Sequence, residues 1–386
     1  MKKVLFVCYG LGIGGIEKCL VNLINVLPEE KFDIDILLMN PEFDLKDQIV
    51  RKVNFVDRFQ YVMNTTDTMK EIRQHGGMIK NICKFIRYCG FRFSVKSHGD
   101  AWKWFKKIHN QYDVAIAYSH HDYSPFFVID KVCANRKVVW YHNGKYDKIG
   151  KEFLRDAKYF KLFDVIVAVS SDCANILIQK FRDEKEKIIV LRNICNTQDI
   201  IKKASDFIPN SFITDGLHIV TVGRLTKEKG ADIALDVCCQ LYNRKYPVTW
   251  HWIGDGNQRQ SIEKEIDKRG LDGIFVLEGN QENPYPFIQY CDIYVQTSYY
   301  EAYSTTITEA KVLGKPIITT DVGGMRDQLQ DGINGFIVPV DVDRIIEKII
   351  LLIENRELLE QFTDTLKKET IVNESALLEY YKTVFQ

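Results

Sequence analysis

Two carboxylates in the second half of the chain have a spacing that suits sugar chemistry. Glu301 and Glu309 are eight residues apart in SYYEAYSTTITEAKVLGKP, residues 298–316. Hydroxyl residues at 304–306 stand at the expected start of a helix, and a helix N-terminus favours a phosphate group. Carboxylates at this spacing would accept hydrogen bonds from sugar and ribose hydroxyls. A solvent-facing helix with a serine N-cap fits the same stretch equally well.

Two cations follow the first expected strand of that half. Arg224 and Lys229 lie in TVGRLTKEKG, residues 221–230, just past a glycine turn. The planar fork of arginine and the point charge of lysine together suit a diphosphate. Cations in a surface loop are also commonly solvated, so this pair points to a phosphate ligand only in combination with other motifs.

A glycine-rich stretch near the N-terminus adds a further phosphate signal. In VLFVCYGLGIGGIEK, residues 4–18, the glycines at 10, 12 and 15 satisfy the dinucleotide-binding fingerprint. An NAD site also needs an acidic residue at the end of the second strand. After the expected strand at 33–39 comes Asn40, with Glu42 displaced. An NAD-dependent oxidoreductase is therefore a distant alternative to another phosphate-bearing ligand.

Histidines close two expected strands of the first half. His142 ends the run KVVWYH, and His120 and His121 lie in YSHHDYSP. A histidine at a strand end can be structural or catalytic. No D-x-D is positioned to carry a metal ion between phosphates. The ten cysteines are scattered without a C-x-x-C, which is typical of reduced, buried thiols.

The elements that position these residues form two successive open α/β domains. Short Val- and Ile-rich runs alternate with helical patterns, and their continuous apolar character predicts parallel sheets covered on both faces. The expected strands are 4–10, 33–39, 113–119, 137–142, 164–170 and 187–193, then 218–224, 248–254, 274–279, 292–298, 316–321 and 336–339.

A polar, turn-rich stretch at 193–216 is expected to link the two domains. The predicted organisation is an N-terminal domain at 1–200 and a C-terminal domain at 201–370. A last helix at 371–386 is expected to pack back on the first domain. Ligands of open α/β sheets bind beyond the carboxyl ends of the strands, so two facing domains would form a cleft.

Composition excludes several classes. Lys+Arg and Asp+Glu each total 52 in 386 residues, so no overall charge favours nucleic acid. No run of about eighteen apolar residues is present, so no membrane-spanning helix is expected. The start MKK followed by apolar residues mimics a signal peptide, but glycines and Glu17 interrupt it soon afterwards. These features predict a cytoplasmic protein.

Five blocks between Val222 and Val338 then occur in a specific order. They read V-G-R-L-x-x-x-K-G, W-I-G-D-G, D-I-Y-V-x-x-S-x-x-E-A-Y-S-x-x-x-x-E-A, G-K-P-I-I-T-T-D-V-G-G and D-G-x-N-G-F-x-V. This series resembles the retaining glycosyltransferases of family 4. The resemblance implies the GT-B fold, in which two Rossmann-like domains face each other across a deep cleft. It also implies that the domain at 1–200 binds the acceptor and the domain at 201–370 binds the nucleotide-sugar.

The resemblance also implies roles for individual residues. Glu301 would hold the donor sugar, Glu309 the ribose, and Arg224 with Lys229 the diphosphate. The common form E-G-F-G reads E-A-Y-S here, and the loss of both glycines leaves the donor sugar undetermined. The other residues implied in donor binding are Gly14, Gly15, Ala302, Tyr303, Ser304 and Thr305.

For catalysis the resemblance implies His142 and Glu301, with His120 as a rival histidine or an acceptor-side residue. Transfer would retain the anomeric configuration through an oxocarbenium-like state, without a metal or other cofactor. The co-substrate would be a nucleotide-diphosphate sugar, a UDP-sugar in preference, and the acceptor a bacterial surface glycan or a lipid-linked glycan. Alternatives are a sugar-nucleotide epimerase of the same fold and a non-catalytic nucleotide-sugar-binding protein.

Residues 78–109 form a basic and aromatic stretch. Eight Lys and Arg side chains accompany one acid, Asp100, among Phe, Tyr and Trp residues. Basic residues with interfacial aromatics suit an amphipathic segment on an anionic bilayer, which would make the protein peripheral to the inner face of the membrane. An ordinary helix pair with an aromatic core and solvated cations is the alternative. No nucleic-acid-binding module is recognisable.

Overall fold

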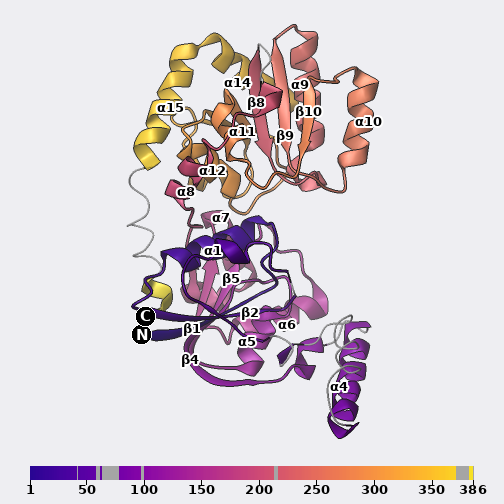
Figure 1. Ribbon diagram of the computed structural model, residues 1–386, viewed down its shortest axis with the longest axis vertical. Helices are drawn as coiled ribbons and strands as arrows, with labels where there is room; N and C mark the ends of the chain where they lie inside the picture. The colour runs from indigo at the N-terminus through magenta and orange to yellow at the C-terminus, as the bar shows by residue number, and fades with distance from the viewer. Residues whose placement is uncertain are drawn as a thin grey trace. The chain divides into compact units, whose positions relative to one another are not determined.

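A computed structural model describes residues 1–40, 42–57, 61–62, 78–96, 100–212, 216–370 and 382–385. The described chain divides into two compact units (Figure 1). The first contains the described parts of 1–169 and 173–191 together with 382–385, and the second contains 170–172 and 192–370. Each unit is a parallel sheet with helices, in agreement with the predicted α/β class.

The first unit is built on a seven-stranded sheet in the order β3-β2-β1-β4-β5-β6-β7, with every described pairing parallel. Residues 4–7 of the first strand are fully buried, as a strand covered on both faces requires. The strands are β1 Lys2–Cys8, β2 Phe32–Leu38, β3 Asn54–Phe55, β4 Ile108–Ala117, β5 Val132–Tyr141, β6 Val165–Ala168 and β7 Ile188–Val190.

The six strands predicted for this half are all present, and of the strands in its described residues the prediction missed only the two-residue edge strand β3. The apolar side chains of Leu20, Leu23 and Ile24 in the first helix are buried. The helices of this half are α1 Gly15–Val26, α4 Met78–Lys96, α5 Ser124–Lys131, α6 Gly150–Phe160 and α7 Ser171–Lys180, with 3-10 turns at Lys46–Gln48, Ala101–Trp104 and Arg182–Lys187.

The second unit has a six-stranded sheet in the order β10-β9-β8-β11-β12-β13, again with parallel pairing. All six predicted strands are present. They are β8 Leu217–Val222, β9 Val248–Ile253, β10 Phe275–Gly279, β11 Ile293–Gln296, β12 Ile317–Thr320 and β13 Phe336–Val338.

Helices cover both faces of this second sheet. Because successive side chains of a strand point to opposite faces, neighbouring residues enter two separate cores: Ile219 and Ile318 one, Val220 and Ile317 the other. In Figure 1, α9 lies beside β9, and both contribute to the first of these cores. The helices are α8 Thr197–Lys203, α9 Ala231–Asn243, α10 Arg259–Arg269, α11 Tyr285–Tyr290, α12 Thr305–Val312, α13 Met325–Gln328, α14 Val342–Glu354 and α15 Arg356–Thr370.

The stretch 193–216 is more than the linker that its polarity predicts. It contains α8 and a 3-10 turn at Asn210–Phe212. Ile200 and Ala204 of this stretch are buried in a core with Phe287 and Ile307. The sequence prediction did not include this helix, because a seven-residue helix needs only a few apolar side chains to anchor it.

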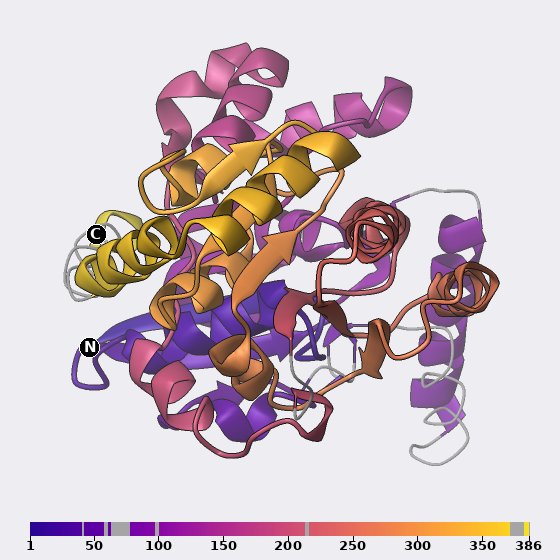
Figure 2. The ribbon, with the colours of Figure 1, turned by 90° about the horizontal axis from the view of Figure 1, so that it is seen from above.

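The end of the chain contributes to both units. In the second unit α14 and α15, yellow in Figure 2, follow one another, and the Phe362 ring lies 5.1 Å from that of Phe336. Residues 382–385 form a helical turn in the first unit. There the ring of Phe385 lies 4.9 Å from that of Phe32, and Lys2 Nζ donates to the Phe385 carbonyl at 2.5 Å. The rest of the predicted helix at 371–386 lies outside the described residues.

Gly230, between the first loop of the second unit and α9, offers a stability test. Its φ is +69°, and an added Cβ would lie 2.0 Å from the Thr297 carbonyl oxygen. Gly230→Ala therefore combines a left-handed backbone, which costs roughly 1–2 kcal/mol for an L-residue, with a steric overlap. We expect it to lower the free energy of unfolding, measured by urea denaturation, well beyond that cost.

Gly270 provides the matched control. It has a φ of +63° but no atom within 4 Å of an added Cβ. Gly270→Ala should therefore show only the backbone cost of about 1–2 kcal/mol. Equal losses for the two variants would contradict close packing of Gly230 against the end of β11.

Candidate functional site

The loops that follow β8 and β11 converge because these two strands are neighbours in the sheet. Lys229 ends a 3-10 turn in the first loop, and Glu301 lies in the second. The Thr297 hydroxyl donates to the Gly230 carbonyl at 2.8 Å, and the Tyr299 N–H donates to the Glu228 carbonyl at 2.8 Å. These bonds hold the loops together at the carboxyl edge of the sheet, where open α/β folds bind ligands.

The Glu301 carboxylate is the centre of this arrangement, and the residue is only 8% exposed. Its Oε1 accepts from Lys229 Nζ at 2.6 Å and from Ser298 Oγ at 2.8 Å. Gln296 Nε2 donates to the same oxygen at 3.2 Å. None of these bonds ends on Oε2. The carboxylate is thus fixed through one oxygen, and the second can accept from a ligand hydroxyl.

Gln296, the last residue of β11, donates to Glu301 and is itself held in place by further hydrogen bonds. Its Oε1 accepts from Tyr294 Oη at 2.9 Å and from Thr306 Oγ1 at 3.1 Å. Its Nε2 also donates to Ser298 Oγ at 2.9 Å. The sequence analysis missed this residue. A glutamine that ends an otherwise apolar strand was the only available signal.

Ser304 caps α12, as its position predicted: its Oγ accepts from the Ile307 N–H at 3.3 Å. Gln328 is a buried residue of α13 that the sequence analysis also missed. It forms hydrogen bonds with both the N–H and the carbonyl of Ser304. The Ser304 N–H donates to Gln328 Oε1 at 2.9 Å, and Gln328 Nε2 donates to the Ser304 carbonyl at 2.7 Å. The first turn of α12 is thereby fixed, with Thr305 as its first residue.

The glycine pair after β12 packs against the same loop. Gly323 has a φ of +51°, and an added Cβ would lie 1.7 Å from the Glu301 carbonyl oxygen. At Gly324 it would lie 2.4 Å from the Ala302 carbonyl oxygen. The pair, which reads as turn chemistry in the sequence, thus allows the backbone around Glu301 to approach closely.

The remaining predicted donor residues are less closely associated. Glu309 on α12 is buried, and Tyr285 Oη donates to its Oε1 at 3.4 Å. Burial raises the pKa of Tyr285, and the Glu309 carboxylate raises it further. Arg224 is 71% exposed and pairs with Glu228 at 3.3 Å, so the structure does not join it to the Lys229–Glu301 pair. Ala302 and Tyr303 are half-buried in the connecting loop.

The predicted residues of the first half belong to the first unit. Gly14 is the N-cap of α1 and Gly15 its first residue. His142 follows β5 and His120 follows β4, and the His142 backbone N–H donates to His120 Nδ1 at 3.2 Å. Burial lowers the pKa of His142 to about 3, with His121 adding to the shift, and burial also lowers that of His120. Both rings are therefore neutral.

Each of the two buried histidines has one ring nitrogen that is available to a ligand. Among the described residues, neither His120 Nε2 nor His142 Nε2 has a hydrogen-bond partner. Because His120 Nδ1 accepts a hydrogen bond, its neutral ring carries the proton on Nε2 and can donate from there. These nitrogens can serve a ligand without a change of charge.

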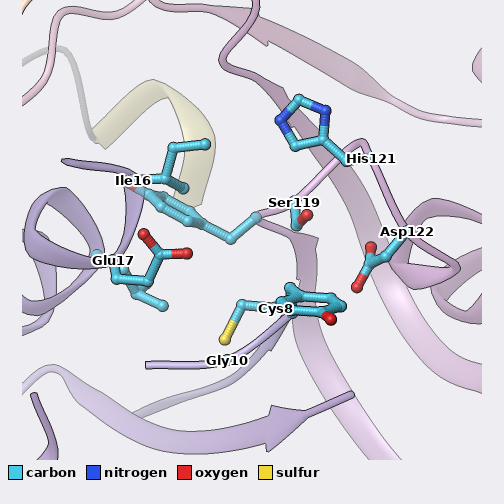
Figure 3. Close-up of a pocket in the computed structure, with 10 residues that line it drawn as sticks. Cys8, Gly10, Ile16, Glu17, Ser119, His121 and Asp122 are labelled. Carbon is cyan, nitrogen blue, oxygen red and sulfur yellow. The ribbon is translucent and has the colours of Figure 1, made fainter. Parts of the chain in front are cut away.

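A cavity of about 210 Å³ opens at the carboxyl ends of β1 and β4 (Figure 3). Cys8, Glu17, Ser119, His121 and Asp122 are among its lining residues. His121, which the sequence analysis mentions only beside His120, is the histidine that lines it. In the described part of the chain, no group of three or more His, Cys, Asp or Glu side chains is arranged to hold a metal ion. None of the described helices has the length and apolarity of a membrane span.

Comparison with known proteins is consistent across the chain. Residues 13–199 match the family model described as Glycosyltransferase Family 4. Residues 202–369 match the model described as Glycosyl transferases group 1. The two matches together account for most of the sequence.

Two bacterial relatives carry specific names. A poly(ribitol-phosphate) alpha-N-acetylglucosaminyltransferase of Staphylococcus aureus is 23% identical over 63% of this chain and 49% of that enzyme. An N-acetylgalactosamine-N,N'-diacetylbacillosaminyl-diphospho-undecaprenol 4-alpha-N-acetylgalactosaminyltransferase of Campylobacter jejuni is 22% identical over 88% of this chain and 87% of that enzyme. The chain spans about half of the length of two further curated relatives that it matches.

Solved structures show the same fold. HepE of Anabaena, crystallised in complex with UDP, superposes with a TM-score of 0.73 at 16% identity, over 99% of both chains. With the two family models, the ordered motifs and two parallel-sheet units, this likeness settles the classification. The chain belongs to the family 4 glycosyltransferases of the GT-B fold.

Proposed function

We propose that the protein transfers a sugar from a nucleotide-diphosphate sugar, a UDP-sugar in preference, to a glycan or lipid-linked acceptor, with retention of configuration. The observation that carries this proposal is the ion pair of Lys229 and Glu301 at the carboxyl edge of the second sheet, 2.6 Å long and beside the N-terminus of α12. The proposed setting is bacterial surface polysaccharide or glycolipid synthesis. The names of the Staphylococcus and Campylobacter relatives and the UDP in the HepE structure support it.

In the proposed reaction, Glu301 Oε2 accepts from a donor sugar hydroxyl while Lys229 and the amide of Thr305 bind the diphosphate, since the Ser304 N–H is held by Gln328. Cations and a helix N-terminus can stabilise the leaving phosphate by electrostatics, so we propose a metal-independent reaction. Arg224 would have to leave Glu228 to join them. We assign His142 to the reacting sugar, as a neutral hydrogen-bonding group beside developing positive charge, and His120 to the acceptor side.

Glu301→Gln tests the central assignment. The amide cannot form an ion pair with Lys229 and loses charge stabilisation at the reacting sugar. We expect kcat/KM to fall by about 10²-fold or more, the usual effect of removing one preorganised electrostatic group. The measurement is release of UDP from a panel of UDP-sugars, with products analysed by NMR for transferred sugar, anomeric configuration or an epimerised donor.

Glu263→Gln, a change of an exposed glutamate on α10, is the matched control and should leave the rate unaltered. Full activity of Glu301→Gln would remove Glu301 from the site. A wild-type protein that only epimerises the donor, or only binds it, would replace the transferase proposal by one of the two alternatives.

Gln328→Leu tests whether a residue remote from the ligand positions the α12 N-terminus. The leucine would leave the buried Ser304 N–H without a partner, at a cost of roughly 1–3 kcal/mol, and the Ser304 carbonyl would keep only its longer bonds from Thr308. We expect the KM for the UDP-sugar to rise by about tenfold, with a smaller change in kcat. UDP binding, followed by calorimetry, should weaken in parallel.

Gln330→Leu alters an exposed glutamine close by and serves as the control. Gln328→Glu keeps an acceptor for the Ser304 N–H and should recover part of the donor affinity. A Gln328→Leu protein that is merely less stable, with an unchanged KM, would contradict a positioning role.

A second part of the proposal concerns the helix α4, whose side chains are described from residue 85 onward. Phe85, Ile86, Arg92, Phe93 and Lys96 are exposed, and their spacing places them on one face of the helix. Phe93 is 75% exposed. The opposite face is buried: Phe91 packs on Phe105 at 5.8 Å, and Trp104 Nε1 donates to Ser94 Oγ at 3.0 Å.

The stretch 78–109 thus combines both sequence interpretations, an aromatic core on one side and an exposed basic-apolar face on the other. Lys103, Lys106 and Lys107 extend the positive charge beyond the helix, and all three are exposed. Aromatic side chains among cations fit the interface of an anionic bilayer. We therefore propose that this face docks a cytoplasmic protein peripherally on an anionic membrane.

Charge reversal of Lys103, Lys106 and Lys107 to Glu should abolish this docking. Each basic residue near an anionic surface contributes about 1 kcal/mol, so the partition coefficient should drop by two orders of magnitude or more. The measurement is co-sedimentation of the full chain with vesicles of equal phosphatidylglycerol and phosphatidylcholine. Salt should weaken the wild-type binding.

The same reversal at Lys151, Lys158 and Lys161, exposed residues on and just after α6, is the control for total charge. It should leave most of the binding intact. Salt-insensitive binding, or equal losses in both triple variants, would remove α4 as the docking element.

A further inference from the structure

The last turn of α15 contains a glutamate whose contacts lead to the start of α12. Glu369 Oε1 accepts from Asn334 Nδ2 at 2.9 Å, and Oε2 accepts from the same nitrogen at 3.1 Å. Glu369 Oε2 also lies 3.2 Å from Lys311 Nζ. The carboxylate therefore joins the end of α15 to the last turn of α12 and to the turn that precedes β13.

Apolar packing brings α15 against α12 and makes these polar contacts possible. Leu366 is fully buried, in one core with Ile307 of α12. Gly314, just after α12, has a φ of +64°, and an added Cβ would lie 3.0 Å from Lys367 Cγ. Glu369 lies one turn after Leu366, so this packing holds its backbone close to the end of α12.

The surroundings of Glu369 require a group that only accepts hydrogen bonds. The orientation of the Asn334 amide is fixed, because its Oδ1 accepts from the Gln330 N–H at 2.8 Å. Its amino group therefore faces Glu369, and the ammonium group of Lys311 faces the same carboxylate. An ionised carboxylate accepts at both oxygens, whereas an amide at this position would direct a donor at one of these donors.

Lys311 connects Glu369 to α13. Its Nζ also donates to the Gln328 carbonyl at 2.6 Å, and its side chain is only 20% exposed. The side chain of Gln328 bonds both backbone polar groups of Ser304, and its Nε2 also donates to Thr308 Oγ1 at 3.0 Å. Without Glu369, Lys311 would carry an uncompensated charge in a largely buried position. It would then turn toward water, and Gln328 would lose the bond that anchors its backbone.

We propose that Glu369 is a positioning residue for the sugar donor: through Lys311 and Gln328 it fixes the N-terminus of α12, the end at which the diphosphate is proposed to bind. The part that concerns the donor rests on the proposed function. The bracing of α12 does not, because it follows from the hydrogen bonds alone.

Glu369→Gln removes the charge and places a donor where the network needs an acceptor. We expect the KM for the UDP-sugar and the Kd for UDP, measured by calorimetry, each to rise about five- to tenfold, with kcat changed by less than about twofold, as for coupling within one hydrogen-bond network. In the ligand-free protein, backbone amides of residues 304–308 should exchange with deuterium faster than in the wild type, because the first turn of α12 opens more often.

Glu360→Gln is the matched control on the same helix. Glu360 is 65% exposed and pairs with Arg356 at 3.2 Å. Its loss should leave the KM, the Kd and the exchange unchanged.

A reciprocal change tests the network itself. When Glu369→Gln is combined with Asn334→Asp, the new amide can donate to the new carboxylate, while its oxygen still accepts from Lys311. The Gln330 N–H also keeps an acceptor. We expect the affinity for UDP to return to within about twofold of the wild-type value, as for two coupled partners.

The outcomes separate positioning from stability. A Glu369→Gln protein that unfolds at lower urea concentration but keeps its KM and Kd would contradict the proposal, and so would a double variant that recovers no affinity. Lys311→Met keeps the length of the side chain and removes both of its polar contacts, so it should raise the KM to a similar extent. It decides the question if Glu369→Gln does not fold.

The failure of the proposed function would look different. A wild-type protein that neither binds UDP nor turns over a UDP-sugar would remove the role in donor binding. Faster exchange at residues 304–308 in Glu369→Gln would then still show that Glu369 braces α12, whereas unchanged exchange would refute the bracing as well.

Discussion

The ion pair between Lys229 and Glu301 is the interaction on which the second unit's site depends. An ion pair that is largely withdrawn from water stabilises little unless further hydrogen bonds compensate for lost hydration. Ser298 and Gln296 supply them on the same carboxylate oxygen. The pair can form only because β8 and β11 are adjacent strands, although 72 residues separate its two members in sequence. The crossover topology of the sheet therefore creates the site.

Close backbone packing then removes most of the freedom of the loops. Gly230 lies against the end of β11, and Gly323 lies against the carbonyl of Glu301. Gln328 fixes the start of α12 through hydrogen bonds with both the backbone N–H and the carbonyl of Ser304. Electrostatic groups that are fixed before a ligand arrives need little reorganisation during reaction. The loop E-A-Y-S has no glycine directly after Glu301. The close approach of the backbone at this point is made possible instead by Gly323 and Gly324, which follow the neighbouring strand β12.

Much of the fold could be predicted from the sequence because parallel strands that are buried on both faces appear in it as continuous apolar runs. All twelve predicted strands exist, and among the strands of the described residues only the two-residue β3 was missed. Lys229 and Glu301, which form an ion pair in the structure, were both singled out by the motif order. Gln296 and Gln328 could not be recognised in the sequence. Their roles depend on hydrogen bonds to residues that only the fold brings near, and a single buried amide produces no periodic pattern. The helix α8 was hidden for a similar reason: its few apolar side chains are too sparse to outweigh a polar stretch.

The docking of Val384 and Phe385 in the first unit means that this unit is not one continuous piece of chain. Its sheet begins at Lys2, whose ammonium group is bonded to the carbonyl of Phe385. A fragment cut near the junction at Leu191 would leave Phe32 without its ring partner and uncover apolar surface beside β1 and β2. An isolated first domain would have to be engineered as a circular permutant, with the terminal helical turn joined ahead of Lys2.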